Sequence, residues 1–359
     1  MIYRLPVIFY IDDTRIEVFM NNDIAELNDM FIAVMDYMKS DSYSAKSMAN
    51  YGKYVESAHD LYKLLIMPCE KWIQGKSITI VPDNILCYLP FEVLLTRDVK
   101  NLKNSFKSLP YLIKEYPISY AYSIRLLDMV NPKQGGKARM LAMAPEFKGD
   151  ESLNFISENI YRSNNLSPLK YNVEEIVNIS KYFKGTYLKG KQANESKFYE
   201  LAENNDIIHI ASHTIIDDNI PMRSKIVLSK DSLDEDGYLN TYEIYQTKLN
   251  ADLVVLSGCQ TGYGKYFKGE GISSLTNGFL YAGCPSIVAT LWDASDKSAM
   301  RLMSYFYKNL SLGQDKDIAL RNAKLEYLEK CPPYKASPHY WAGFIMIGHT
   351  NPVVPPDTG

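Results

Sequence analysis

The chain has 359 residues, of which 46% are hydrophobic and 23% charged, and its formal net charge is −3. This composition is typical of a globular protein with one large or two modest domains, and it excludes global disorder. The mild negative charge does not indicate the clustered basic surface that nucleic acids and anionic membranes require, so we expect neither partner.

The first part of the chain predicts a hairpin, two long helices, and then two short strands that are followed by a short helix. Asp12 and Asp13 lie between two apolar runs, which is typical of a hairpin. Pro82, Asp83 and Asn84 predict a turn between two strands. The predicted strands are residues 7–10, 15–20, 77–81 and 85–88, and the predicted helices are residues 24–39, 48–65 and 91–95.

A linker is predicted at residues 131–137, where NPKQGGK concentrates Pro, Gly and Lys. We place a domain boundary inside it. The prediction is a first unit at residues 1–134, a second at 135–351, and a Pro-rich tail at 352–359.

Strands and helices alternate through the second unit. Its predicted strands are residues 140–144, 186–188, 206–212, 225–228, 253–257, 286–291 and 343–347. Its predicted helices are residues 173–183, 195–203, 274–282, 297–309 and 318–329. Runs such as IIHIA and LVVLS are continuously apolar, as in a parallel sheet that is buried on both faces. The pattern therefore predicts an α/β sandwich with a mostly parallel central sheet.

Two reactive side chains follow predicted strands directly. His213 ends DIIHIASH, and Cys259 follows DLVVLSG. Catalytic groups in parallel sheets gather beyond the carboxyl ends of the strands, and a His close to a Cys can hold it as a thiolate. The alternative for Cys259 is a small buried hydrophobic residue. His209 lies mid-strand and is predicted to be a buried structural histidine, whereas His213 lies at the strand exit.

The five cysteines form no CxxC pair, which argues against a disulfide framework and against a zinc knuckle. Neither a P-loop nor a GxGxxG motif is present, so we expect no nucleotide, metal or other cofactor. The sequence has no apolar run of membrane-spanning length and no signal-peptide pattern. We expect a soluble, cytoplasmic protein.

Three acidic residues are candidates for a substrate pocket. Asp293 and Asp296 follow the predicted strand that runs into Trp292, and Glu270 lies in the glycine-rich segment after Cys259. An acidic rim there would favour Lys or Arg at P1, the substrate residue before the cleaved bond. The alternatives are that Asp296 caps the following helix and that Glu270 is a solvated loop charge.

Five segments resemble the motifs of the CHAT domain, a family related to caspases, separases and gingipains. They are IVPDNILCYLPFEVLL, DIIHIASHT, ADLVVLSGCQTG, GEGISSLTNGFLYAGCPSIVATLWDASD and PHYWAGFIMIG, in the family's order. The resemblance implies a caspase-like three-layer sandwich, preceded by a degenerate caspase-like lobe in residues 1–134. It also implies a His213–Cys259 dyad and an oxyanion hole formed by the N–H groups of Cys259 and Thr214.

Two positions depart from the family pattern, which has Gly after the His and Ala before the Cys. Here they are Thr214 and Gly258. The tetratricopeptide repeats that often accompany the family are absent from these 359 residues. Two alternatives follow: the chain is a fragment of a longer protein that carries a repeat region, or its regulator is a separate tetratricopeptide-repeat or other protein that we expect as a partner.

The prediction is a cysteine endopeptidase that acts on protein or peptide substrates through a thioester acyl-enzyme. One alternative is a catalytically degenerate interaction module of the same fold, for which Thr214 is the best support. The other is an acyl-transferase or amidase that uses the same dyad.

Overall fold

The computed structural model describes residues 7–12, 15–20, 24–39, 45–99, 105–129, 138–147, 168–230, 236–258, 265–267, 271–273, 275–293 and 295–353. The predicted nucleophile Cys259 and the predicted pocket residue Glu270 lie outside the described residues.

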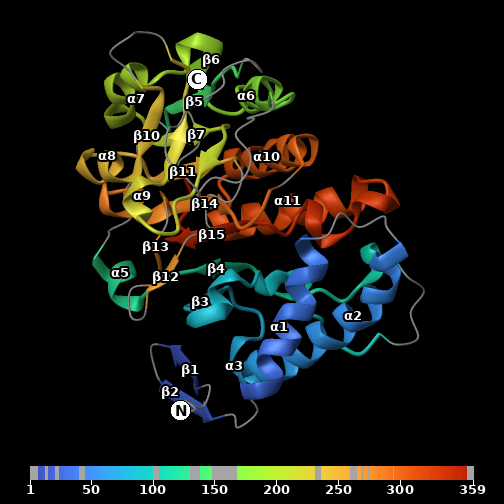
Figure 1. Ribbon diagram of the computed structural model, residues 1–359. Helices are drawn as coiled ribbons and strands as arrows, with labels where there is room; N and C mark the ends of the chain where they lie inside the picture. Colours follow the sequence, from blue (N-terminus) through green and yellow to red (C-terminus); the bar gives the residue numbers. More distant parts are fainter. Residues whose placement is uncertain are drawn as a thin grey trace.

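The core is an eight-stranded sheet in the order β3-β4-β15-β14-β11-β7-β5-β6 (Figure 1). Its strands are β3 Ile78–Ile80, β4 Ile118–Tyr120, β5 Met140–Ala144, β6 Gly185–Lys189, β7 Ile207–Ile210, β11 Leu253–Leu256, β14 Ser286–Thr290 and β15 Phe344–Gly348. All neighbours pair in parallel except β14 and β15. The strands β14, β11, β7, β5 and β6 therefore end at one common edge of the sheet.

Helices cover both faces of this sheet, with α6, α10 and α11 on one side and α7, α8 and α9 on the other (Figure 1). The helices are α1 Ile24–Lys39, α2 Ala45–Leu65, α3 Glu70–Ile73, α4 Leu112–Glu115, α5 Ile124–Met129, α6 Asn172–Ile179, α7 Glu195–Leu201, α8 Thr241–Gln246, α9 Leu275–Tyr281, α10 Asp296–Ser311 and α11 Lys316–Lys330. Every residue of β5, β7, β11 and β14 is buried, as expected between two helical layers. The predicted three-layer sandwich with a mostly parallel sheet is confirmed.

Smaller elements surround this core. They are the antiparallel sheet β10-β9-β8 (Tyr238–Asn240, Lys225–Val227, Thr214–Ile215), the hairpin β1-β2 (Val7–Asp12, Arg15–Met20) and the hairpin β12-β13 (Lys265–Phe267, Gly271–Ser273). The sheet β10-β9-β8 matters for the site because β8 begins at the residue directly after His213.

Some sequence predictions of secondary structure were wrong. Residues 85–88 form a 3₁₀ helix, Asn84–Tyr88, rather than a strand, and the helix predicted at 91–95 is the 3₁₀ turn Phe91–Val93. Asn84 has a φ of 55°, a left-handed conformation that turns the chain away from an extended path. The strand β4 was not predicted, because its three residues are too few to show a periodicity.

The central sheet contains strands from both sides of the predicted linker, since β3 and β4 precede residues 131–137. A buried polar group also joins the two parts. Lys324 Nζ of α11 lies 2.8 Å from Glu92 Oε1, and the Tyr120 hydroxyl donates to Glu92 Oε2 at 2.5 Å. The domain boundary at residue 134 remains a prediction. The strands on its two sides, β3 and β4 before it and the other six after it, belong to one sheet.

Candidate functional site

The strands that lead to His213 and Cys259 are direct neighbours. β7 and β11 pair in parallel, and their last registered pair is Ile210 with Leu256. The ladder continues, because Ser257 N–H donates to the carbonyl of Ile210 at 3.0 Å. The adjacency that the sequence required for a Cys–His site is therefore present at the carboxyl edge of the sheet.

His213 is held at this edge by its backbone and by an aromatic ring. Its carbonyl accepts a hydrogen bond from Val227 N–H of β9 at 2.9 Å. The ring of Phe147 meets its imidazole edge-on, with 4.7 Å between centroids and 62° between planes. The residue is 9% exposed, so the imidazole has limited contact with solvent.

Thr214 follows in β8, opposite Ile226 of β9. Hydrogen-bonded and non-hydrogen-bonded pairs alternate along an antiparallel ladder. Because Val227 donates to His213, the next pair, Thr214 and Ile226, is a non-hydrogen-bonded one. The N–H of Thr214 is therefore not directed at β9.

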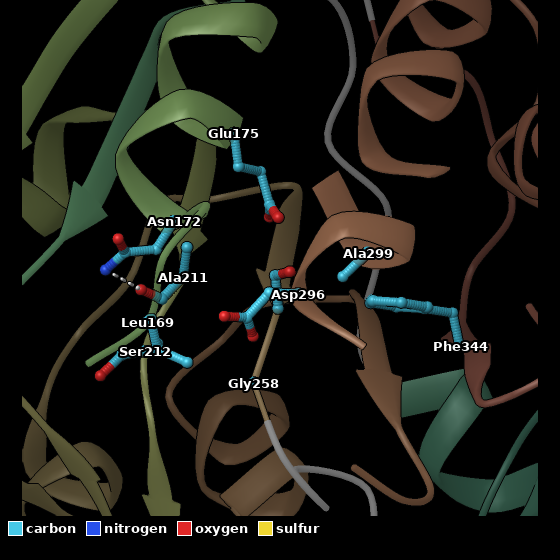
Figure 2. A pocket seen from close by; sticks show the side chains of 10 residues that line it. Leu169, Asn172, Glu175, Ala211, Ser212, Gly258, Asp296, Ala299 and Phe344 are labelled. Carbon is cyan, nitrogen blue, oxygen red and sulfur yellow. Dashed lines mark hydrogen bonds between the residues drawn. The ribbon is translucent and has the colours of Figure 1, made fainter. Parts of the chain in front are cut away.

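A small cavity of about 30 Å³ lies beside these strand ends (Figure 2). Four of its lining residues, Ala211, Ser212, Ser257 and Gly258, belong to the segments that leave β7 and β11. The remaining walls come from α6 and the residues before it, from α10 and from β15. Ser212 directly precedes His213 and Gly258 directly precedes Cys259, so the cavity adjoins both predicted catalytic residues along the chain.

Two carboxylates face this cavity, Glu175 from α6 and Asp296 from α10 (Figure 2). The Glu175 side chain is 4% exposed, and its Oε1 lies 2.9 Å from Nε2 of the buried His209. Neither of these two atoms has a hydrogen-bond partner of normal geometry. His209 also contacts the Tyr307 hydroxyl through Nδ1 at 3.1 Å, which confirms it as a buried histidine within the sheet layer.

The predicted pocket residues occupy different places. Asp296 is the first residue of α10, its N-cap is Ser295, and its carboxylate accepts a hydrogen bond from Lys170 N–H at 3.1 Å. The alternative that Asp296 caps the following helix is therefore wrong, because Ser295 holds the N-cap position. Asp293 is exposed, shortly after β14. Of these two, the structure brings only Asp296 to the cavity.

Glu175 and Asn172 line the cavity but were not singled out from the sequence. A signal was present. The buried positions of α6 are Asn172, Glu175, Ile176 and Ile179, so two polar residues share the helical face that carries the core isoleucines. A carboxylate on the apolar stripe of an amphipathic helix is unusual enough to mark a site.

The family model described as "CHAT domain" matches residues 55–349. The chain belongs to the CHAT domain family. The resemblance seen in the five motifs is confirmed, and the match extends well before the predicted linker into the part of the chain that supplies β3 and β4.

Other similarities are more distant. The chain is 28% identical over 110 residues to "Tetratricopeptide repeat protein 28" of Homo sapiens, which is 31% of this chain and 4% of the length of that relative. Its structure is similar to separase in a Saccharomyces cerevisiae separase–securin complex, with a TM-score of 0.47, 14% identity, and coverage of 96% of this chain and 21% of that one. It is also similar to the Arg-specific cysteine proteinase gingipain R, with a TM-score of 0.48, 12% identity, and coverage of 92% and 75%.

Within the described ranges, no three His, Cys, Asp or Glu side chains gather as ligands for a metal ion. The described helices likewise include none with the length and apolar character needed to cross a bilayer.

Proposed function

We propose that this CHAT chain is a cysteine endopeptidase with Cys259 as nucleophile and His213 as base. His213 takes the thiol proton, and Cys259 Sγ attacks the carbonyl carbon of the scissile peptide bond. The C–N bond then breaks, and the amine leaves with the proton from His213, which gives a thioester. Water, deprotonated by His213, hydrolyses the thioester and regenerates the thiol.

One observation carries the proposal, the register of β7 against β11. His213 is three residues beyond Ile210, and Cys259 is three residues beyond its partner Leu256. These equal counts run along the sequence from a registered pair on adjacent parallel strands, which are spaced about 4.8 Å apart. Equal counts on adjacent parallel strands are what a Cys–His pair requires.

The oxyanion hole in this proposal consists of the N–H groups of Cys259 and Thr214. Two such donors stabilise the negative oxygen of the tetrahedral intermediate. The direction of the Thr214 N–H, away from β9, supports this role.

The proposed substrate is an extended segment of a protein or peptide. Asp293 and Asp296 follow β14 in the sequence, and Glu270 lies in the segment after Cys259. In this proposal their negative charge favours a basic P1 residue. We further propose that residues 1–134 form a degenerate lobe, that activity depends on a tetratricopeptide-repeat or other regulatory protein, and that the enzyme acts in the cytoplasm. The tetratricopeptide name of the human relative supports the partner class.

The test is the alkylation rate of each cysteine by iodoacetamide between about pH 5 and 9, measured by mass spectrometry for wild type and His213→Ala. We expect Cys259 to react fastest, to stay reactive well below the free-thiol pKa of about 8.5, and to lose this advantage in the variant. The control variant is His59→Ala, which removes a half-buried imidazole at a position far from His213 in the sequence. His209→Ala is not suitable as a control, because His209 is fully buried.

If Cys259 reacts no faster than the other cysteines, with or without His213, this chain has no assembled dyad, and the proposal for the isolated chain is refuted. The same result in the presence of the natural partner favours the interaction module. Turnover of small acyl esters without cleavage of proteins favours the acyl-transferase or amidase.

A further inference from the structure

The cavity beside the strand ends is an acidic recess with apolar walls. Its charged lining residues are the carboxylates of Glu175 and Asp296, and none of the described residues that line it is Lys or Arg. The apolar lining is Leu169, Ala211, Ala299 and Phe344. A recess of this kind fits a cation that is carried on an aliphatic stem.

Glu175 is the deeper of the two carboxylates and lacks full compensation. Its side chain is 4% exposed, and Oε1 is among the buried atoms without a hydrogen-bond partner. His209 Nε2 is close, at 2.9 Å, but is not aligned to donate. A buried carboxylate is costly unless it is paired and hydrogen-bonded, so this position favours a cationic donor arriving from the cavity.

Asp296 adds a second negative charge to the recess, beyond that of Glu175, which lies beside His209. Its carboxylate is partly exposed and accepts a hydrogen bond from a backbone amide, Lys170 N–H, which carries no full charge. Glu175 therefore forms the floor of the recess and Asp296 its more accessible part.

The volume of the cavity favours the smaller of the two cationic groups that a basic side chain can carry. About 30 Å³ holds one or two groups of the size of a water molecule. The ammonium group of lysine is a compact point charge of this size, whereas the guanidinium group of arginine is a larger plane with a fixed fork of donors.

The position of the cavity selects which substrate residue enters it. Gly258 lines the cavity and is bonded to Cys259, and Ser212 lines it and is bonded to His213. In the proposed reaction Cys259 attacks the carbonyl carbon of the P1 residue. The side chain nearest to that carbonyl is the P1 side chain itself.

We infer that this cavity is the P1 pocket and that it selects lysine over arginine, with Glu175 as the specificity-determining residue. The inference rests on the proposed peptidase function and deepens it. The ammonium group occupies the cavity and donates to Glu175 and Asp296, and the methylene stem of the lysine lies at the mouth of the cavity.

The experiment uses peptidyl acyloxymethyl ketones that are identical except for Lys, Arg or Leu at P1, and it follows labelling of Cys259 by mass spectrometry. Each rate is divided by the rate with iodoacetamide, which has no P1 group. For wild type we expect the Lys probe to exceed the Leu probe by on the order of 10- to 100-fold, as for a hydrogen bond to a charged group. The Lys probe should also exceed the Arg probe, because the guanidinium group is larger than the cavity. In Glu175→Gln, which keeps the shape, this preference should fall by at least about 10-fold.

Glu174→Gln is the matched control, because it removes the same charge from the same helix at an exposed position. It should keep the preference for lysine. Equal rates for the Lys and Arg probes, or fastest labelling by the Leu probe, would overturn the inference while the proposed dyad stands. The wild-type comparison decides this even if Glu175→Gln does not fold. If iodoacetamide labels Cys259 without dependence on His213, the proposed function fails, and the inference fails with it.

Discussion

The buried ion pair between Glu92 and Lys324 predicts a large and specific loss of stability when one partner is removed. Their side chains are 2% and 1% exposed, and the N···O distance is 2.8 Å. With an effective dielectric constant of about 20, the Coulomb attraction at this distance is about 6 kcal/mol. Desolvation of the two ions costs several kcal/mol each, so the intact pair contributes little net stability.

Removal of one partner leaves that desolvation cost without the attraction. For Lys324→Met we expect the free energy of unfolding to fall by about 3–5 kcal/mol. Glu92→Gln should lose a similar amount near neutral pH. Burial already lowers the pKa of Lys324, and Glu92 offsets part of this, so the loss in Glu92→Gln should shrink as rising pH removes the proton from the unpaired lysine. The double variant should lose less than either single variant, because no buried charge remains.

Urea unfolding followed by circular dichroism measures these differences. Lys197→Met is the matched control, since Lys197 pairs with Glu200 on the surface and both side chains are largely exposed, at 44% and 57%. This change should cost less than about 1 kcal/mol. The reasoning is refuted if Lys324→Met costs no more than Lys197→Met, or if the losses in the double variant simply add.

Three further predictions concern cysteines, a glycine and a buried carboxyl. Burial raises the pKa of four cysteine thiols, to about 12 in Cys87 and Cys284 and by a smaller amount in Cys69 and Cys331. Because the thiolate is the form that reacts, iodoacetamide near pH 7.5 should label all four at least about 10-fold more slowly in the folded than in the urea-unfolded chain. Equal labelling rates in the two states would contradict this prediction. Gly348 has a φ of 93°, and an added Cβ would lie 2.1 Å from the Pro285 carbonyl oxygen. Gly348→Ala should therefore lower the free energy of unfolding by about 3 kcal/mol or more. An unchanged urea midpoint would disprove the strain. Burial raises the pKa of Asp317, and hydrogen bonds from Ser77 and from Ile318 N–H partly oppose this rise. The folded state therefore loses stability as the pH rises from 3.8, the ordinary pKa of the carboxyl, through the folded pKa. Asp317→Asn should be more stable than wild type at pH 7, and the difference between their urea midpoints should shrink toward pH 3.8.

The sequence by itself determined the layered α/β architecture, the strands that lead to the site and the family. Continuous apolar runs show burial on both faces of a sheet, and this is a local property that can be read from IIHI and LVVL directly. The positions of His213 and Cys259 directly after such runs follow from the same local pattern. The motif order sufficed for the family, which the match over residues 55–349 confirms.

Only the tertiary structure decided the order of the strands, and with it what meets at the sheet edge. Strand order depends on pairings between distant segments, such as β4 with β15, and no local pattern encodes them. For the same reason the cavity could not be predicted. Glu175 and Asp296 are far apart in the chain and meet because α6 and α10 pack on the same face of the sheet. The sequence showed a carboxylate on an apolar helical face, and packing alone decided what that carboxylate faces.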